Sequence, residues 1–174
     1  HKRRVAQRIG IESFMGQELK TAVARQRVLL GGILNVPMER LARHCAELWP
    51  DRDALENLLT QQMQTLPSCK YLYVLDAQAH QITANVTARG LLPDQFGRDR
   101  SQRPYLAGAL TGKRFTMSDA YLSRNARRPS LTAVQRIENQ YGSLMGYLGA
   151  DFDLRELPLT REIYQQPEQW VQMK

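Results

Sequence analysis

Residues 143–154, SLMGYLGADFDL, are the stretch of this chain that decides its fold. Apolar residues and glycines fill nearly every position until two aspartates end the run. A strand with one face in water alternates polar and apolar residues, whereas a run that is apolar almost throughout is typical of a strand covered on both faces. The stretch therefore predicts the central strand of a sheet.

Four other segments predict strands that join this one. SLTAVQRIEN (130–139) alternates polar and apolar residues and reaches the central strand through the turn QYG, and RFTMS (114–118) is a shorter strand. KYLYVLD (70–76) and QITANVT (81–87) are separated by a short turn and predict a hairpin. We expect residues 88–100 to form a loop, because glycine and proline interrupt them.

The first third of the chain predicts helices. Apolar residues recur three and four positions apart over 11–33, which predicts one long helix that the Gly/Pro-containing stretch 31–37 should end. A second helix is expected over 37–48, a third from the capping residue Asp51 to residue 66, and a short one over 104–112. Helices followed by antiparallel strands indicate an α+β domain.

Composition narrows the class of protein. The length of 174 residues fits one domain, and no stretch approaches the 18 apolar residues of a membrane helix. Cys45 and Cys69 are interpreted as two buried thiols rather than a disulfide. His1, His44 and His80 are scattered, so neither a metal site nor a cofactor is expected.

Positive charge is concentrated in one segment of the sequence. Residues 88–128 hold nine basic and three acidic residues, which is nearly the whole net charge of +7. Its centre, GRDRSQRPYL (97–106), has three arginines beside Pro-Tyr. Three interpretations are open at this point: a solvated loop, a nucleic-acid contact, or the anion-binding end of a small-molecule pocket.

The order of the motifs resembles a known family. A long N-terminal helix followed by LYVLD, GRDRSQRPYL, SDAYLS and GYLGADFDL is similar to the Cache or PDC class of PAS-like sensor domains, over roughly residues 41–157. The resemblance implies a PAS-like antiparallel sheet of five to six strands, with a ligand pocket under its covering loops. It divides the chain into a helical segment (1–66), a sensor core (67–157) and a linker (158–174) toward an output domain outside this chain.

The amino-acid-binding branch of that class has a pocket pattern, which this chain matches with four residues: Arg103, Tyr105, Tyr121 and Asp151. It departs from the pattern at Leu106, where an aromatic is expected, and at Ser123, where an aspartate is expected. The part of the pattern that binds a carboxylate is therefore present, since it includes an arginine, which offers a carboxylate two parallel donors. The half that would hold an ammonium group is partial, so organic acids fit as well as amino acids.

Flanking polar residues complete the predicted ligand-binding set: Arg98, Arg100, Asp119 and Ser123. The two arginines could instead pair with neighbouring aspartates. Arg103 should act together with the free N–H groups of the helix that follows it. Two other groups are assigned to the core and to the solvated surface: Tyr71 and Tyr73, and Arg124, Arg127 and Arg128.

The predicted function is a ligand-sensing domain of a bacterial-type signal transduction protein. It would bind a small anionic metabolite, pair as a homodimer through its N-terminal helix, and signal by rearranging helices. Catalysis is not expected, because no nucleophile–base pair or phosphate-binding loop is present. The alternatives are a nucleic-acid-binding module using Arg89–Arg128, although no known nucleic-acid motif supports it, or a ligand-free dimerisation scaffold.

The compartment is weighed on the basic residues Lys2, Arg3, Arg4 and Arg8. A cytoplasmic module is slightly favoured, because an extracytoplasmic position of this cluster would run against the positive-inside tendency. A periplasmic, membrane-anchored sensor is the alternative.

Overall fold

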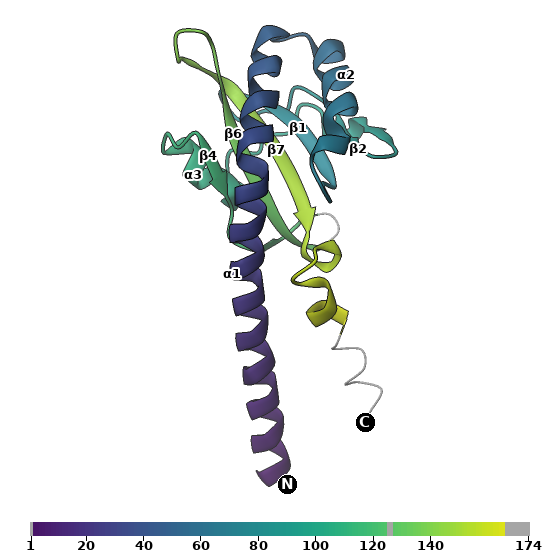
Figure 1. Cartoon of the computed structure of the whole chain (residues 1–174), viewed down its shortest axis with the longest axis vertical. Coiled ribbons are helices and arrows are strands. Elements are labelled where there is room, and N and C mark those ends of the chain that lie inside the picture. The colour runs from purple at the N-terminus through teal and green to yellow at the C-terminus, as the bar shows by residue number, and fades with distance from the viewer. Residues whose placement is uncertain (1, 125–126, 166–174) are drawn as a thin grey trace.

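The computed structural model describes residues 2–124 and 127–165, as a sheet with two helices packed on one of its faces (Figure 1). The helices are α1 (Lys2–Glu47), α2 (Arg52–Gln62) and α3 (Ala107–Leu110). The strands are β1 (Tyr71–Asp76), β2 (Asn85–Thr87), β3 (Gly90–Leu92), β4 (Phe115–Met117), β5 (Tyr121–Leu122), β6 (Pro129–Glu138) and β7 (Leu144–Asp153). Single 3₁₀ turns lie at Met63–Thr65, Pro93–Gln95, Pro104–Leu106 and Leu154–Glu156.

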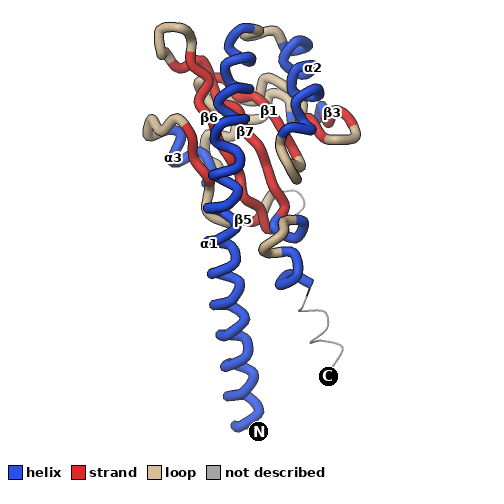
Figure 2. Tube along the Cα trace, viewed as in Figure 1, coloured by secondary structure: helices blue, strands red, loops and turns tan. Residues whose placement is uncertain are grey.

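The strands form one antiparallel sheet in the order β3-β2-β1-β7-β6-β4, with β5 also paired to β6 (Figure 2). β7 lies between β1 and β6, so the prediction of a central strand is confirmed, and so is the α+β class. The sheet has seven strands rather than five to six. Two of them, β3 and β5, are too short for a detectable sequence pattern.

The predicted break in the first helix is wrong, because α1 continues through Gly31, Gly32 and Pro37. Buried side chains keep their spacing of three and four residues across the break: Leu30, Leu34, Met38, Leu41 and Cys45. Burying each contributes roughly 1.5–3 kcal/mol, which outweighs about 1 kcal/mol for a helical glycine and about 3 kcal/mol for proline. Gly31 also allows close packing, since a Cβ there would lie 3.1 Å from Met117 Cγ.

The predicted second helix, 37–48, is part of α1, whereas the predicted third helix corresponds to α2 and begins where expected. The Asp51 side chain accepts a hydrogen bond from the Ala54 N–H at 3.1 Å, which caps α2. Glu56 of this helix is buried, and its carboxylate accepts from the Ala84 N–H at 2.6 Å. This bond fixes α2 against the segment that leads into β2.

Alternation along the strands gives the sheet two different faces. In β1, Leu72 and Val74 pack under α1 and α2, whereas Tyr71, Tyr73 and Leu75 point to the opposite face. Register then places Tyr71 of β1, Asp151 of β7 and Thr132 of β6 side by side on that opposite face. The three strands thus bring polar side chains from distant parts of the sequence together.

Three smaller predictions can be compared with the structure. Cys45 is buried and Cys69 half-buried, and both are free thiols. The predicted C-terminal linker is described only as far as residue 165, so its remainder lies outside the described residues. Within the described ranges, no helix has the length and hydrophobicity needed to cross a membrane.

Candidate ligand-binding site

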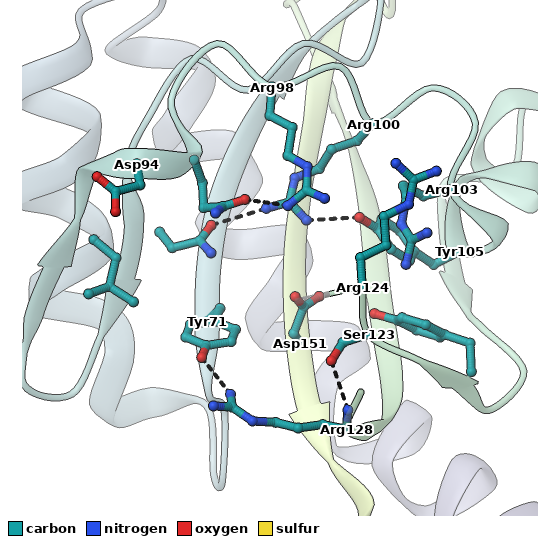
Figure 3. Close-up of a pocket in the computed structure, with 14 residues that line it drawn as sticks. Tyr71, Asp94, Arg98, Arg100, Arg103, Tyr105, Ser123, Arg124, Arg128 and Asp151 are labelled. Carbon is teal, nitrogen blue, oxygen red and sulfur yellow. Dashed lines mark hydrogen bonds between the residues drawn. The ribbon is translucent and has the colours of Figure 1, made fainter. Parts of the chain in front are cut away.

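A cavity of about 290 Å³ opens on the face of the sheet opposite α1 and α2 (Figure 3). Its lining residues are Tyr71, Asn85, Leu92, Asp94, Gln95, Arg98, Arg100, Arg103, Tyr105, Tyr121, Ser123, Arg124, Arg128 and Asp151. The volume is near the lower end of the range for small-molecule sites, which suits a metabolite. Five lining arginines face two aspartates, so the lining carries an excess of positive charge.

The chain that covers the cavity is anchored to the end of the β1–β2 connection. The Gln81 N–H donates to the Arg98 carbonyl at 2.9 Å, and the Gly97 N–H donates to the Gln81 carbonyl at 2.8 Å. The Arg100 N–H donates to the Ala79 carbonyl at 2.9 Å. These bonds hold the loop like an additional strand and direct its arginines toward the sheet.

Arg100 is the most buried arginine of the cavity, with 5% of its surface exposed. Its Nε donates to Gln81 Oε1 at 2.8 Å, its Nη1 to the Tyr105 hydroxyl at 2.8 Å, and its Nη2 to Asn85 Oδ1 at 3.3 Å. Its guanidinium lies 4.1 Å from the centre of the Tyr73 ring. Burial alone would lower the pKa of Arg100, but Tyr73, Tyr105 and the Asp151 carboxylate raise it overall, so the charge is retained.

Arg103 lies at the mouth of the cavity, over two tyrosine rings. Its guanidinium is 5.7 Å from the Tyr105 ring and 5.8 Å from the Tyr121 ring, and the two rings are 5.2 Å apart. The prediction that Arg103 acts together with the free N–H groups of a following helix is wrong. The chain after Arg103 forms only a 3₁₀ turn and the four-residue α3, which is too short for a substantial helix dipole.

Asp151 lies on the sheet surface at the base of the cavity. Its Oδ1 accepts hydrogen bonds from the Tyr73 hydroxyl and from Thr132 Oγ1, both at 2.8 Å. Among the described residues, no donor bonds its other oxygen, which is free for a ligand. Burial raises the pKa of Asp151 above its ordinary value, and Arg100 partly opposes this shift.

The opposite end of the cavity is formed by Arg128 and Tyr71. Arg128 Nη1 donates to the Tyr71 hydroxyl, and the Arg128 N–H donates to Ser123 Oγ at 2.9 Å. Tyr71 packs against the core as predicted but also lines the cavity, and Arg124 is exposed as predicted but also lines it. The assignment of Arg128 to the solvated surface is wrong, because this residue is half-buried in the cavity. β5 pairs with β6, which folds this loop back over the sheet.

Two predictions for charged residues need correction. Asp119 does not line the cavity; it is exposed and shares a separate depression with Arg27, because the β4–β5 connection passes on that side. Arg98 bonds Gln95 and Arg100 bonds neutral groups, so their alternative pairing with aspartates is not observed in the described part of the chain. Arg127 is exposed, as predicted.

Neighbouring charges affect the arginines of the cavity. Burial lowers the pKa of Arg98, and the positive charges of Arg100 and Arg103 lower it further. An anion bound among these groups would relieve their mutual repulsion. Within residues 2–124 and 127–165, no group of three acidic, histidine or cysteine side chains is arranged to hold a metal.

Comparison with known proteins gives matches at the level of structure alone. No family model matches the sequence, and no curated protein matches it. Among solved structures, the ligand-binding domain of the Pseudomonas fluorescens chemoreceptor CtaA, in complex with L-serine, matches with a TM-score of 0.55 and 21% identity over 85% of this chain and 61% of that one. The chain has the fold of a chemoreceptor ligand-binding domain.

Two further chemoreceptor domains show the same fold. The Pseudomonas aeruginosa amino acid chemoreceptor PctC, in complex with GABA, matches with a TM-score of 0.57 and 19% identity over 84% of this chain and 65% of that one. The sensory domain of a Campylobacter jejuni chemoreceptor with isoleucine bound matches with a TM-score of 0.58 and 13% identity over 88% and 64%. The chain spans less than two thirds of each, and the predicted resemblance to Cache sensor domains is confirmed for the fold.

Proposed function

We propose that this chain is the ligand-binding domain of a signal-transduction receptor, and that it binds a small carboxylic acid rather than catalysing a reaction. The observation that carries the proposal is the state of Arg100. Its three hydrogen bonds go to an amide oxygen of Gln81, an amide oxygen of Asn85 and a phenol. A buried charge with only neutral bonded partners is costly, and an anionic ligand would supply a directly bonded counter-charge in addition to the nearby Asp151.

Asp151 supports a ligand that also carries a hydrogen-bond donor. Its free oxygen lies on the same surface as the Arg100 guanidinium, so it can accept from an amine or a hydroxyl of the ligand. Amino acids and hydroxy acids both have this combination. The matched receptors were solved with L-serine, GABA and isoleucine, which agrees with the class of ligand.

The position of the arginines argues against the nucleic-acid alternative. Five of the nine basic residues in the segment 88–128 line the cavity. A nucleic-acid site would instead use them across a continuous outer surface, where they could follow a phosphate backbone. A ligand-free scaffold would gain little from a buried arginine whose hydrogen bonds all go to neutral groups.

We further propose that the signal leaves the domain through α1 and that a second copy of the chain pairs along this helix. Four of its large apolar side chains are exposed: Val28, Leu29, Ile33 and Val36. Ligand binding would have to favour one arrangement of the paired helices over another. The output domain would lie outside this chain.

A thermal-shift screen of amino acids and organic acids at constant ionic strength tests the proposed function. A ligand at 100 times its Kd should raise the Tm by about 5–10 °C. Arg103→Ala should weaken binding by roughly tenfold, because it removes a positive charge of the cavity lining that attracts the anion while leaving the fold intact. Arg114→Ala, at an exposed arginine outside the cavity, should bind like the wild type.

Two results would refute the proposal. The first is a Tm that no small acid raises, together with a salt-dependent affinity for DNA or RNA, which would favour the nucleic-acid alternative. The second is unchanged ligand affinity in Arg103→Ala.

A further inference from the structure

The direction of the hydrogen bonds around Asp151 follows from counting protons. Thr132 has one hydroxyl proton and donates it to Asp151, so the bond between Thr132 and Tyr121 must have the phenol as its donor. Tyr73 also donates to Asp151. Burial raises the pKa of both tyrosines, so they keep the protons that these bonds need. The hydroxyl protons of Tyr73 and Tyr121 are thus already used within the protein.

Tyr105 and Tyr71 are in the opposite situation. Each phenol oxygen accepts a bond from an arginine, which has no acceptor atom: Tyr105 from Arg100, and Tyr71 from Arg128. Each phenol therefore keeps its proton to donate. Arginine has five N–H groups, and Arg100 uses three of them on protein partners. The cavity holds two Arg–Tyr pairs, and each can give a ligand a phenolic donor and guanidinium donors.

The two pairs lie at separate ends of the cavity. Arg100 is stacked on Tyr73 and Arg128 is bonded to Tyr71. These tyrosines are two positions apart on β1, which places their side chains about 7 Å apart on one face. Asp151 is the register partner of Tyr71, and Figure 3 shows it between the two guanidinium groups. The order of groups is therefore anion site, carboxylate, anion site.

From this arrangement, and resting on the proposed function, we infer that the ligand is a short dicarboxylic acid. One carboxylate is held by Arg100 and Tyr105, and the other by Arg128 and Tyr71. A donor between them, such as an amine or a hydroxyl, bonds the free oxygen of Asp151. An arginine and a phenol together offer the two donors that one carboxylate accepts.

A ligand with one carboxylate would satisfy only one end. The other Arg–Tyr pair would keep unpaired donors inside the cavity, which lowers affinity. The backbone supports the Arg128 end in particular, because the Arg128 N–H is bonded to Ser123 and the side chain cannot leave without breaking its bond to Tyr71. Both ends lie in loops that hydrogen bonds attach to neighbouring segments: the Arg100 N–H donates to the Ala79 carbonyl, and the Arg128 side chain donates to Tyr71 of β1.

The test compares dicarboxylates with their half-amides, which have the same shape and one charge less. Calorimetric titration at constant pH and ionic strength would use L-glutamate with L-glutamine, L-aspartate with L-asparagine, and succinate with succinamate. We expect the dicarboxylate of the preferred pair to bind at least about tenfold more tightly than its half-amide. Tyr71→Phe and Arg128→Gln should lower dicarboxylate affinity toward that of the half-amide, and should lower half-amide affinity by a smaller factor, because a neutral amide forms weaker bonds with this end than a carboxylate does.

Arg89→Gln is the matched control, because it makes the same change in net charge at an exposed residue outside the cavity. Equal affinity of acid and half-amide in every pair would overturn the inference while leaving the proposed function in place. An equal loss of preference in Arg89→Gln would also overturn it, because net charge alone would then explain the effect. If no small acid binds, the inference and the proposed function both fail. Should Arg128→Gln fail to fold, Tyr71→Phe alone decides, since it removes one oxygen atom.

Discussion

At the scale of single residues, Asp151 shows how the fold makes a chemical group unusual. Pairing of β7 with β1 and β6 places it between Tyr71 and Thr132 on one face of the sheet. Two hydroxyl groups then hold one oxygen, while burial raises the pKa of the carboxyl group. The residue is fixed in position but takes up a proton more readily than an ordinary aspartate.

The raised pKa of Asp151 gives a pH dependence whose sign can be worked out. In the unliganded protein the folded state binds this proton more tightly than the unfolded state, so Asp151 lowers the free energy of unfolding as pH rises through its folded pKa. The affinity for an amine-carrying ligand has the opposite pH dependence. It weakens as pH falls from 7.5 toward 4.5, because protonated Asp151 no longer attracts the amine. Denaturant titrations and calorimetry across this range should show both trends, and Asp151→Asn should remove them.

The control for this pH dependence is Asp119→Asn, at an exposed aspartate outside the cavity. It should keep both trends. Identical pH profiles for the wild type and Asp151→Asn would contradict the prediction, because the titrating group would then lie elsewhere.

The residues that could be predicted from the sequence differ in kind from those that could not. Arg103 and Tyr121 could be predicted because their spacing matches the pocket pattern of the family, and both line the cavity. Arg127 and Arg128 are adjacent, equally basic and in one loop, yet only Arg128 lines the cavity. The register of β5 on β6 separates them, and local composition contains no information about register.

At the scale of elements, the strands were predictable by pattern and the end of α1 was not. The run 143–154 identified β7 because burial on both faces leaves a continuous apolar sequence. Gly31, Gly32 and Pro37 suggested an end to the helix because local preference disfavours them there. The sheet under α1 overrides that preference, since it buries the helix face on both sides of these residues. Tertiary packing of this kind is invisible to a local pattern.

Gly149 of β7 provides a test of how closely the elements of the site fit. A Cβ at this position would lie 2.2 Å from Tyr73 Cε2, so the ring of Tyr73 lies directly on the glycine. Gly149→Ala should therefore displace the ring, lower the free energy of unfolding by about 1–3 kcal/mol and weaken the Tyr73–Asp151 bond. Urea denaturation measures the stability, and ligand titration should show reduced affinity.

Gly32→Ala is the matched control for this substitution. Nothing lies within 4 Å of a Cβ at Gly32, which is an exposed position of α1. Alanine should stabilise the protein there by about 0.5–1 kcal/mol, because it is the better helix former. If Gly149→Ala were as stable as the wild type, Tyr73 would not be held in the way described.

At the scale of the whole molecule, the cavity is connected to α1 by a chain of hydrogen bonds. Thr132 bonds Asp151 through its side chain and pairs with Ser118 through its backbone. Arg27 of α1 donates to the Ser118 carbonyl at 3.0 Å and to the Met117 carbonyl at 2.8 Å. These bonds therefore connect the sheet at Asp151 to the long helix on its opposite face, so that a movement at Asp151 can shift α1.

The same region of α1 also holds the end of the described chain. The Gln26 side chain is buried and accepts a hydrogen bond from the Leu159 N–H at 2.8 Å. The segment that follows β7 is thus attached to α1, and it extends toward the end of the molecule where α1 begins (Figure 1). A ligand-dependent shift of α1 would therefore also reach the segment around Leu159.

The exposed side of α1 allows the proposed dimer to be tested. Val28 and Val36 are 75% and 60% exposed, and the helix extends beyond the sheet, where it has no sheet to pack against (Figure 1). A long helix with exposed apolar residues is expected to pack against another apolar surface, and a second α1 offers one.

In sedimentation equilibrium the wild type should dimerise at micromolar concentration, and Val28→Lys with Val36→Lys should shift it to monomer without changing ligand affinity. Gln78→Lys, an exposed site in the turn after β1, should remain dimeric. A monomeric wild type that still binds ligand would exclude pairing along α1 and require the signal to leave through one helix.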